Sequence, residues 1–146
     1  MKIYVASSWR NPYQPSIVLE LRDLGFEVYD FKNPPLREGF KWESIDPYWR
    51  YWSTSDYIRA LDHPMADAGF NSDFNAMKEA DACVLVLPAG RSAHSEAGYM
   101  KGAGKKVYVL QLTPEEPELM YKMYDGVYED TDELFDVLKL ESNNIG

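Results

Sequence analysis

The segment at residues 82–104, ACVLVLPAGRSAHSEAGYMKGAG, decides the fold because it passes from a buried strand into a helix. Its first six residues, 82–87, are all apolar, which is typical of a strand covered on both faces. A short loop with Pro88 and Gly90 follows, and residues 92–104 have the spacing of an amphipathic helix. A strand that leads straight into a helix indicates a parallel α/β sheet.

The rest of the chain repeats this alternation. Apolar or alternating runs predict further strands at residues 3–6, 26–31, 106–112 and, briefly, 127–129. Helical spacing predicts helices at residues 15–24, 54–61, 65–80, 115–124 and 131–140, with a frayed tail at 141–146. We therefore expect an α/β fold: one domain over residues 1–146, with a three-layer, doubly wound parallel sheet of about five strands, flavodoxin- or Rossmann-like.

An aromatic-rich insertion after the second strand breaks the pattern. Residues 32–53 combine three prolines with Trp42, Trp49 and Trp52. Long loops inside domains are usually functional or disordered, and the aromatic content argues against disorder. The insertion is either a small satellite core or a platform on which a nucleobase stacks.

Composition limits the classes of partner. The net charge of −9 over 146 residues argues against a nucleic-acid partner. No apolar run has the length of a signal-peptide core or a membrane span, so we expect a cytoplasmic protein without membrane contact. The single cysteine, Cys83, lies in an apolar run and reads as a core thiol. With two histidines, no zinc spacing and no glycine-rich nucleotide motif, we expect no metal and no cofactor.

Two carboxylates fall where a helix should be apolar. On a helical wheel Asp73 lies near the middle of the apolar arc of helix 65–80, and Glu96 lies at the centre of the apolar face of helix 92–104. A buried carboxylate without a partner is costly and marks a candidate functional site. For Asp73, the alternative is that the helix starts a residue or two away from the predicted position.

Two structural alternatives apply to Glu96. A capping box does not fit, because with Ser92 as the N-cap the box position would be Ser95. A salt bridge with Arg10 or Arg91 stays open. His94 projects from the opposite, solvent-facing side of the helix.

The environments of the two carboxylates predict different roles. Glu96 is expected in the first helical turn, where the helix dipole favours the ionised form that a nucleophile needs. Asp73 has no such help, so burial should raise its pKa and suit it to donate a proton. Paired carboxyls with separated pKa values are typical of glycosidic cleavage.

Three segments resemble the nucleoside 2-deoxyribosyltransferase family and its nucleotide N-glycosidase relatives. These are the opening strand KIYVASSW at 2–9, DFNAMKEAD at 73–81 and SAHSEAGY at 92–99. The resemblance implies that Glu96 is the catalytic nucleophile, that Tyr4 orients it, and that Asp73 contacts the sugar and assists proton transfer. It also implies a parallel-sheet fold and a homo-oligomer, a dimer or larger, in which a neighbour completes the site.

One position departs from the transferases. They place a base-reading aspartate ahead of the glutamate, where this chain has Gly90. The nucleotide-hydrolysing relatives use a small-residue loop there to hold a 5′-phosphate, and Gly90-Arg91-Ser92 looks closer to that loop.

The expected function is therefore cleavage of the N-glycosidic bond of a small-molecule nucleoside or nucleoside 5′-monophosphate, by hydrolysis or base exchange. We expect the substrate to be bound by side chains from the first strand end and the last loop, namely Ser7, Trp9, Arg10, Gly90, Arg91 and Ser92. Two alternatives stay open: a nucleotide-sensing module without turnover, and an NAD glycohydrolase.

Overall fold

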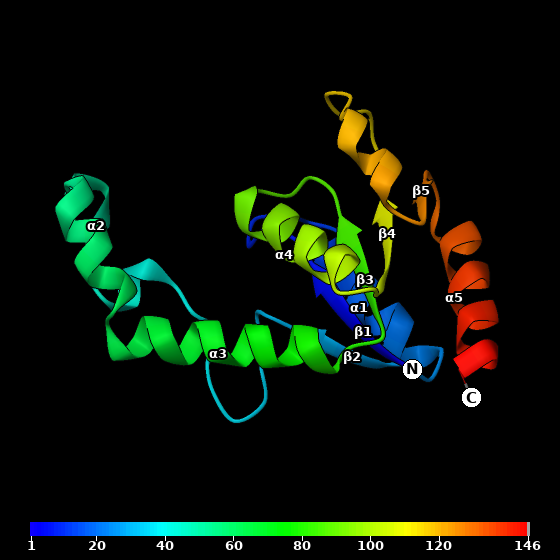
Figure 1. Ribbon diagram of the computed structural model, residues 1–146, viewed down its shortest axis with the longest axis horizontal. Helices are drawn as coiled ribbons and strands as arrows, with labels where there is room; N and C mark the ends of the chain where they lie inside the picture. The colour runs from blue at the N-terminus through cyan, green and yellow to red at the C-terminus, as the bar shows by residue number, and fades with distance from the viewer. Residues whose placement is uncertain (146) are drawn as a thin grey trace.

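A five-stranded, all-parallel sheet forms the centre of the computed structural model, which describes residues 1–145 (Figure 1). The strand order is β2-β1-β3-β4-β5. The strands are β1 (Lys2–Ala6), β2 (Glu27–Asp30), β3 (Ala82–Val86), β4 (Lys106–Leu110) and β5 (Gly126–Tyr128). This is the flavodoxin order, whose direction switches between β1 and β3. The predicted doubly wound α/β fold is confirmed.

Helices cover both faces of the sheet and make three layers, with α1 (Gln14–Asp23) and α5 (Thr131–Ile145) on one face and α3 (Pro64–Glu79) and α4 (Arg91–Gly102) on the other. The remaining helix, α2 (Thr54–Leu61), contacts α3 and lies away from the sheet (Figure 1). Because successive strand side chains point to opposite faces, Ile3 and Val5 pack with α1 and α5, whereas Tyr4 and Ala6 pack with α3 and α4. The strand residues of β3 are buried on both faces, as the uninterrupted apolar run predicts.

Helix α3 extends beyond the sheet, and α2 lies at its far end (Figure 1). The predicted apolar arc of this helix is therefore only partly buried. Ala66, Gly69 and Met77 are buried, but Phe70 is 60% exposed. Similarly, Ala93, Ala97 and Met100 of α4 are buried, whereas Tyr99 is 40% exposed.

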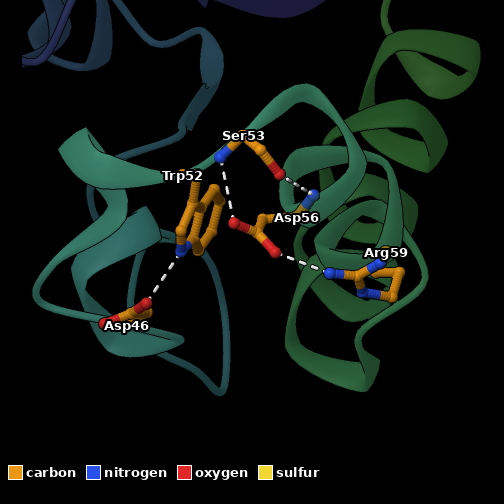
Figure 2. A network of polar contacts seen from close by, with 5 residues as sticks. All are labelled: Asp46, Trp52, Ser53, Asp56 and Arg59. Atoms are coloured by element: carbon orange, nitrogen blue, oxygen red, sulfur yellow. Dashed lines mark hydrogen bonds and ion pairs between the residues drawn. The ribbon is translucent and has the colours of Figure 1, made fainter.

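The insertion at 32–53 is folded rather than loose. It contains two short 3-10 helices, Trp42–Ser44 and Trp49–Tyr51. Figure 2 shows how its end is fixed: the Trp52 indole Nε1 donates to Asp46 Oδ2 at 2.7 Å, and Ser53 and Asp56 form a capping box at the start of α2. A box of this kind satisfies free backbone N–H groups and fixes where a helix begins.

Two glycines allow the insertion to dock closely. A Cβ atom at Gly39 would lie 2.7 Å from the Trp9 ring, and one at Gly69 would lie 2.7 Å from Phe40 Cβ. Both distances are shorter than the closest approach of two non-bonded heavy atoms, so neither position accepts a side chain without a shift of its neighbour. The insertion is thus seated against the loop after β1 on one side and against α3 on the other.

Two predicted elements were wrong. The helix expected at 115–124 is only a 3-10 helix, Leu119–Met123, because Pro117 lacks an N–H and disfavours helical backbone before it. Residues 141–145 of the tail expected to fray are helical, since α5 continues to Ile145 with no glycine or proline to stop it, and residue 146 lies outside the described residues. Within residues 1–145 no helix combines the length and the hydropathy that a membrane crossing requires.

Candidate active site

A cavity of about 690 Å³ lies where β1 and β3 end, at the switch in strand order. Its lining comes from the loop after β1, the insertion, α3 and the first turns of α4. Of the residues predicted for the site, it brings together Ser7, Trp9, Asp73, Gly90, Arg91, Ser92 and Glu96. In doubly wound sheets this crevice is the usual position of a ligand.

The side chain of Tyr4, which comes from the sheet, anchors Glu96. The hydroxyl of Tyr4, a fully buried residue of β1, donates a hydrogen bond to Glu96 Oε2. No hydrogen bond within residues 1–145 involves Glu96 Oε1, and the carboxyl group lines the cavity. Glu96 therefore has one oxygen fixed and the other available to a ligand.

Asp73 has a parallel arrangement that the sequence did not suggest. The Tyr29 hydroxyl of β2 donates to Asp73 Oδ1 at 2.7 Å and also lies 2.8 Å from Ser72 Oγ. Tyr29 stands beside Tyr4 in the β1–β2 register, and their rings stack with centroids 5.3 Å apart. The two carboxylates are thus each anchored by a tyrosine from adjacent strands.

Burial raises the pKa of both carboxylates. For Glu96, burial and the nearby Asp73 charge outweigh the Tyr4 hydrogen bond and raise the pKa to about 7. For Asp73, burial raises the pKa, while the Tyr29 hydrogen bond and the Arg37 charge oppose the rise. The expectation that Glu96 would stay readily ionised while only the pKa of Asp73 rose was wrong.

The start of α4 explains that difference. The helix begins at Arg91 with Gly90 as its N-cap, so Glu96 lies in the second turn and not the first. The dipole effect is concentrated in the first turn, where it would favour a carboxylate most. With this N-cap the box position is Ala93, so a capping role for Glu96 stays excluded. Glu96 also makes no ion pair within the described part of the chain.

The two loops at the switch point are tied together. Ser7 Oγ donates to the Val86 carbonyl at 2.8 Å, and the Gly90 N–H donates to Ser8 Oγ at 2.7 Å. Asn11 Nδ2 donates to the carbonyls of Val86 and Pro88, at 3.0 and 2.9 Å. These bonds fix the approach of the chain to α4, and they occupy the hydroxyl of Ser7. Sequence reasoning missed Asn11 because it lies in no motif.

Two predicted residues lie elsewhere than expected. Arg10 is exposed and lines a neighbouring depression with Ser8, Trp9 and Gly90, not the cavity that holds the carboxylates. His94, expected on an exposed face, is half-buried: its Nε2 lies 2.8 Å from the Tyr121 hydroxyl, in the connection between β4 and β5. Tyr121 in that connection packs against His94 at the start of α4. A helical wheel cannot predict this contact, because it considers only residues of the same helix.

Aromatic side chains of the insertion form the outer wall of the cavity. Phe31, Phe40, Trp42 and Trp49 line it together with Trp9. Side chains of the insertion also pack edge to face with one another, as in the Phe40–Trp42 pair with centroids 4.8 Å apart. The insertion is therefore a packed aromatic cluster whose inner surface faces the cavity, and its use as a stacking platform for a nucleobase stays a prediction.

A second cavity, of about 790 Å³, adjoins the first on the side of α2 and α3. Asp73 and Glu96 line both, together with Trp42, Arg91 and Ser92. The far wall consists of apolar side chains, among them Tyr57, Phe70, Phe74 and Tyr99. The carboxylates thus stand at the junction of two openings. Within residues 1–145 no group of three or more His, Cys, Asp or Glu side chains could share a metal ion.

Comparison of the whole fold finds three solved structures of interest. One is a 2-deoxyribosyltransferase from Bacillus psychrosaccharolyticus, 23% identical, with a TM-score of 0.62 over 92% of this chain and 90% of that one. The chain has the fold of a 2-deoxyribosyltransferase. The shared fold is the one that the three sequence segments led us to expect.

The other two structures extend the likeness. A CMP N-glycosidase from Clostridium botulinum is 17% identical, with a TM-score of 0.51 over 95% of this chain and 99% of that one. A conserved protein from Enterococcus faecalis V583 is 15% identical, with a TM-score of 0.61 over 97% and 98%. No protein-family model and no curated protein matches the sequence. At these identities the likeness establishes the fold, and the chemistry has to be argued from the site.

Proposed function

We propose that this protein cleaves the N-glycosidic bond of a nucleoside or nucleoside 5′-monophosphate with Glu96 as the nucleophile. The observation that carries the proposal is the bond between Tyr4 and Glu96 inside the cavity at the switch point. A half-buried carboxylate with one oxygen anchored and the other available to a cavity suits attack on a carbon. The fold shared with a 2-deoxyribosyltransferase and a CMP N-glycosidase supports the same chemistry.

The reaction has two steps. Glu96 Oε1 attacks the anomeric carbon, the bond from that carbon to the base nitrogen breaks, and its electron pair leaves with the base. The sugar is then held as an ester of Glu96. Water, or the nitrogen of a second base, displaces the ester and regenerates the carboxylate, which accounts for hydrolysis and base exchange alike.

Asp73 assists from the neighbouring helix. Burial raises its pKa, so it retains a proton at higher pH than a surface aspartate does. In the first step that proton passes to the departing base, and in the second the carboxylate accepts one from water or from the incoming base. Asp73 also lines both cavities, which is the position a group contacting the sugar requires.

The cavity walls suit the two ends of a nucleotide. Arg91 and Ser92, at the N-terminus of α4, and Lys41, from the insertion, offer positive charge and hydrogen-bond donors to a 5′-phosphate. The aromatic wall offers ring faces and edges to the base, which contribute about 1–3 kcal/mol per stacked base. Most of that wall lies in the insertion, so base preference is assigned to residues 32–53.

The proposal is tested by chromatography of free base released from a panel of nucleosides and nucleoside 5′-monophosphates. Glu96→Ala should abolish release from every substrate that the native protein cleaves. Glu79→Gln, an exposed position at the end of α3, is the matched control and should leave the rate unchanged. An unchanged rate for Glu96→Ala would refute the nucleophile. Binding by calorimetry without product from any nucleoside, nucleotide or NAD would favour a sensing module instead.

We further propose that the protein functions as a homo-oligomer. Apolar side chains on α2 and α3 are exposed, with exposed fractions of 55% for Ile58, 42% for Met65 and 60% for Phe70, and Phe70 also lines the second cavity. Exposed apolar surface beside a site is typical of an interface. Light scattering gives the state directly, and a monomer at the assay concentration would refute the proposal.

A further inference from the structure

The hydrogen bond between Tyr29 and Asp73 has a fixed direction, and this direction decides which oxygen of Asp73 carries a proton. The Tyr29 hydroxyl has one proton, and an ionised carboxylate can only accept. Tyr29 therefore donates to Asp73 Oδ1, and Ser72 Oγ, 2.8 Å away, donates in turn to the Tyr29 oxygen. The result is a chain of hydrogen bonds from Ser72 through Tyr29 to Asp73, in which each bond polarises the next.

This chain distinguishes the two oxygens of Asp73. Oδ1 already accepts from Tyr29, while the hydrogen bonds found within residues 1–145 leave Oδ2 without a protein partner. When Asp73 takes up a proton, Oδ1 keeps its bond only if it remains the carbonyl-like oxygen. The proton therefore resides on Oδ2, in the carboxyl group that lines both cavities.

We propose that Tyr29 is a positioning residue that holds the proton of Asp73 on Oδ2 and so directs it to the departing base. This inference rests on the proposed function for its catalytic consequence, but the coupling of Tyr29 to Asp73 stands on geometry alone. During cleavage the Oδ2–H bond breaks as the proton transfers to a base nitrogen, and the negative charge left on Asp73 is stabilised by the Tyr29 hydrogen bond.

The charged groups around Asp73 come from every element packed against it. Tyr29 of β2 and Arg37 of the insertion both favour its ionised form. Glu96 of α4 is close enough for the Asp73 charge to raise its pKa, and Tyr4 of β1 is affected by the charges of both carboxylates. Lys41 and Arg91 line the same cavity. Of these groups only Tyr29 contacts Asp73 by a hydrogen bond, which makes Tyr29 the one to change.

The matched variants are Tyr29→Phe and Tyr4→Phe. Each keeps the stacked ring and removes one hydroxyl, so both should fold. Ser72→Ala is a milder second variant, because it removes the group that polarises Tyr29. The first readout is ¹³C NMR titration of the side-chain carboxyl carbons in the full-length protein. Loss of the Tyr29 donor should move the titration of Asp73 to higher pH by at least half a unit, and Ser72→Ala should move it less in the same direction.

The second readout compares leaving groups that need a proton with one that does not. Tyr29→Phe should slow release of the base from a natural nucleoside by ten- to a hundredfold, within the range of general acid catalysis. It should change release of 4-nitrophenolate from 4-nitrophenyl β-D-ribofuranoside by less than threefold. Tyr4→Phe should slow both substrates alike, because the nucleophile acts on each.

The outcomes separate the two proposals. An Asp73 titration that Tyr29→Phe leaves in place, or equal slowing of both substrates, would overturn the role of Tyr29. If the native protein cleaves neither substrate, the proposed function fails, and the NMR titration alone then decides whether Tyr29 governs the proton of Asp73.

Discussion

Tyr4 and Tyr29 stand side by side on adjacent parallel strands, with their rings stacked at an interplanar angle of 13°. Each hydroxyl reaches a different carboxylate, Glu96 on α4 and Asp73 on α3. The sheet register therefore sets the relative positions of two groups that come from separate helices. Such support from rigid strands is what a preorganised site requires.

The first prediction concerns the nucleophile and pH. Glu96 must be ionised to attack and Asp73 must carry a proton to donate, so the cleavage rate should pass through a maximum as the pH changes, and the pKa of about 7 of Glu96 should set one limb of that profile. Tyr4→Phe removes a hydrogen bond that lowers the pKa of Glu96, so this limb should move to higher pH and the rate at pH 7 should fall at least tenfold. Initial rates between pH 5 and 9 provide the check. A limb that stays in place would show that Tyr4 does not act through Glu96.

A second prediction links the buried carboxylate to stability. Glu96 has a pKa of about 7 when folded and 4.5 ordinarily, so the folded state binds more protons between these values. Stability should therefore fall as pH rises from about 4.5 through 7. Glu96→Gln cannot ionise, and it should be more stable than the native protein above pH 7.5 by up to about 3 kcal/mol. Below pH 4.5 the two proteins should unfold alike.

Urea unfolding at pH 4.5 and pH 8 measures this difference. The comparison needs both pH values, because a gain equal at both would come from packing and not from ionisation. A variant less stable than the native protein at pH 8 would contradict the burial of an ionised Glu96.

The third prediction tests the wall of the cavity. Gly69→Ala places a methyl group 2.7 Å from Phe40 Cβ, so Phe40 and the insertion must shift. We expect KM for the substrate to rise at least fivefold. Gly98→Ala is the matched control, since a Cβ there meets nothing within 4 Å, and it should stabilise α4 by about 1 kcal/mol. Equal KM values for the two variants would show that the insertion does not contribute to substrate binding.

Asn11 supplies the fourth prediction. It is buried, and while its Nδ2 holds the loop before α4, its Oδ1 accepts from the N–H groups of Tyr13 and Gln14. Asn11→Ala should destabilise the protein by ~1–3 kcal/mol through unsatisfied groups. Asn11→Asp keeps the acceptor but buries a carboxylate against the carbonyls of Val86 and Pro88, so at neutral pH it should be less stable than Asn11→Ala. Thermal unfolding ranks the two variants, and the reverse order would assign the main role to the acceptor Oδ1.

The sheet could be predicted from sequence because its signal is local. The apolar runs around Val5 and Val84 and the helices between them have periodicities that propensity and spacing reveal. Glu96 and Asp73 stood out for the same reason, as charges on apolar faces. Tyr29 did not, because its role depends on which strand pairs with β1, and pairing is a property of the folded sheet.

The remaining differences have similar causes. The N-cap of α4 is Gly90 and not Ser92, which places Glu96 outside the first turn, and a shift of two residues at a helix end lies within the usual uncertainty of sequence patterns. His94 is covered by Tyr121, which is 27 residues away in the sequence, so no local pattern contains that contact. The sequence therefore predicts the two carboxylates of the site, whereas the side chains that hold or cover the site residues, such as Tyr29 and Tyr121, are found only in the folded structure.

In the proposed mechanism Glu96 forms a covalent bond with the sugar. Intact-mass spectrometry after rapid acid quenching of the protein with a cleaved substrate detects that bond. We expect a mass increase equal to the sugar moiety without its base, localised by peptide mapping to Glu96 and missing from Glu96→Gln. Release of the base with no adduct at any quench time, or an adduct that persists in Glu96→Gln, would contradict it.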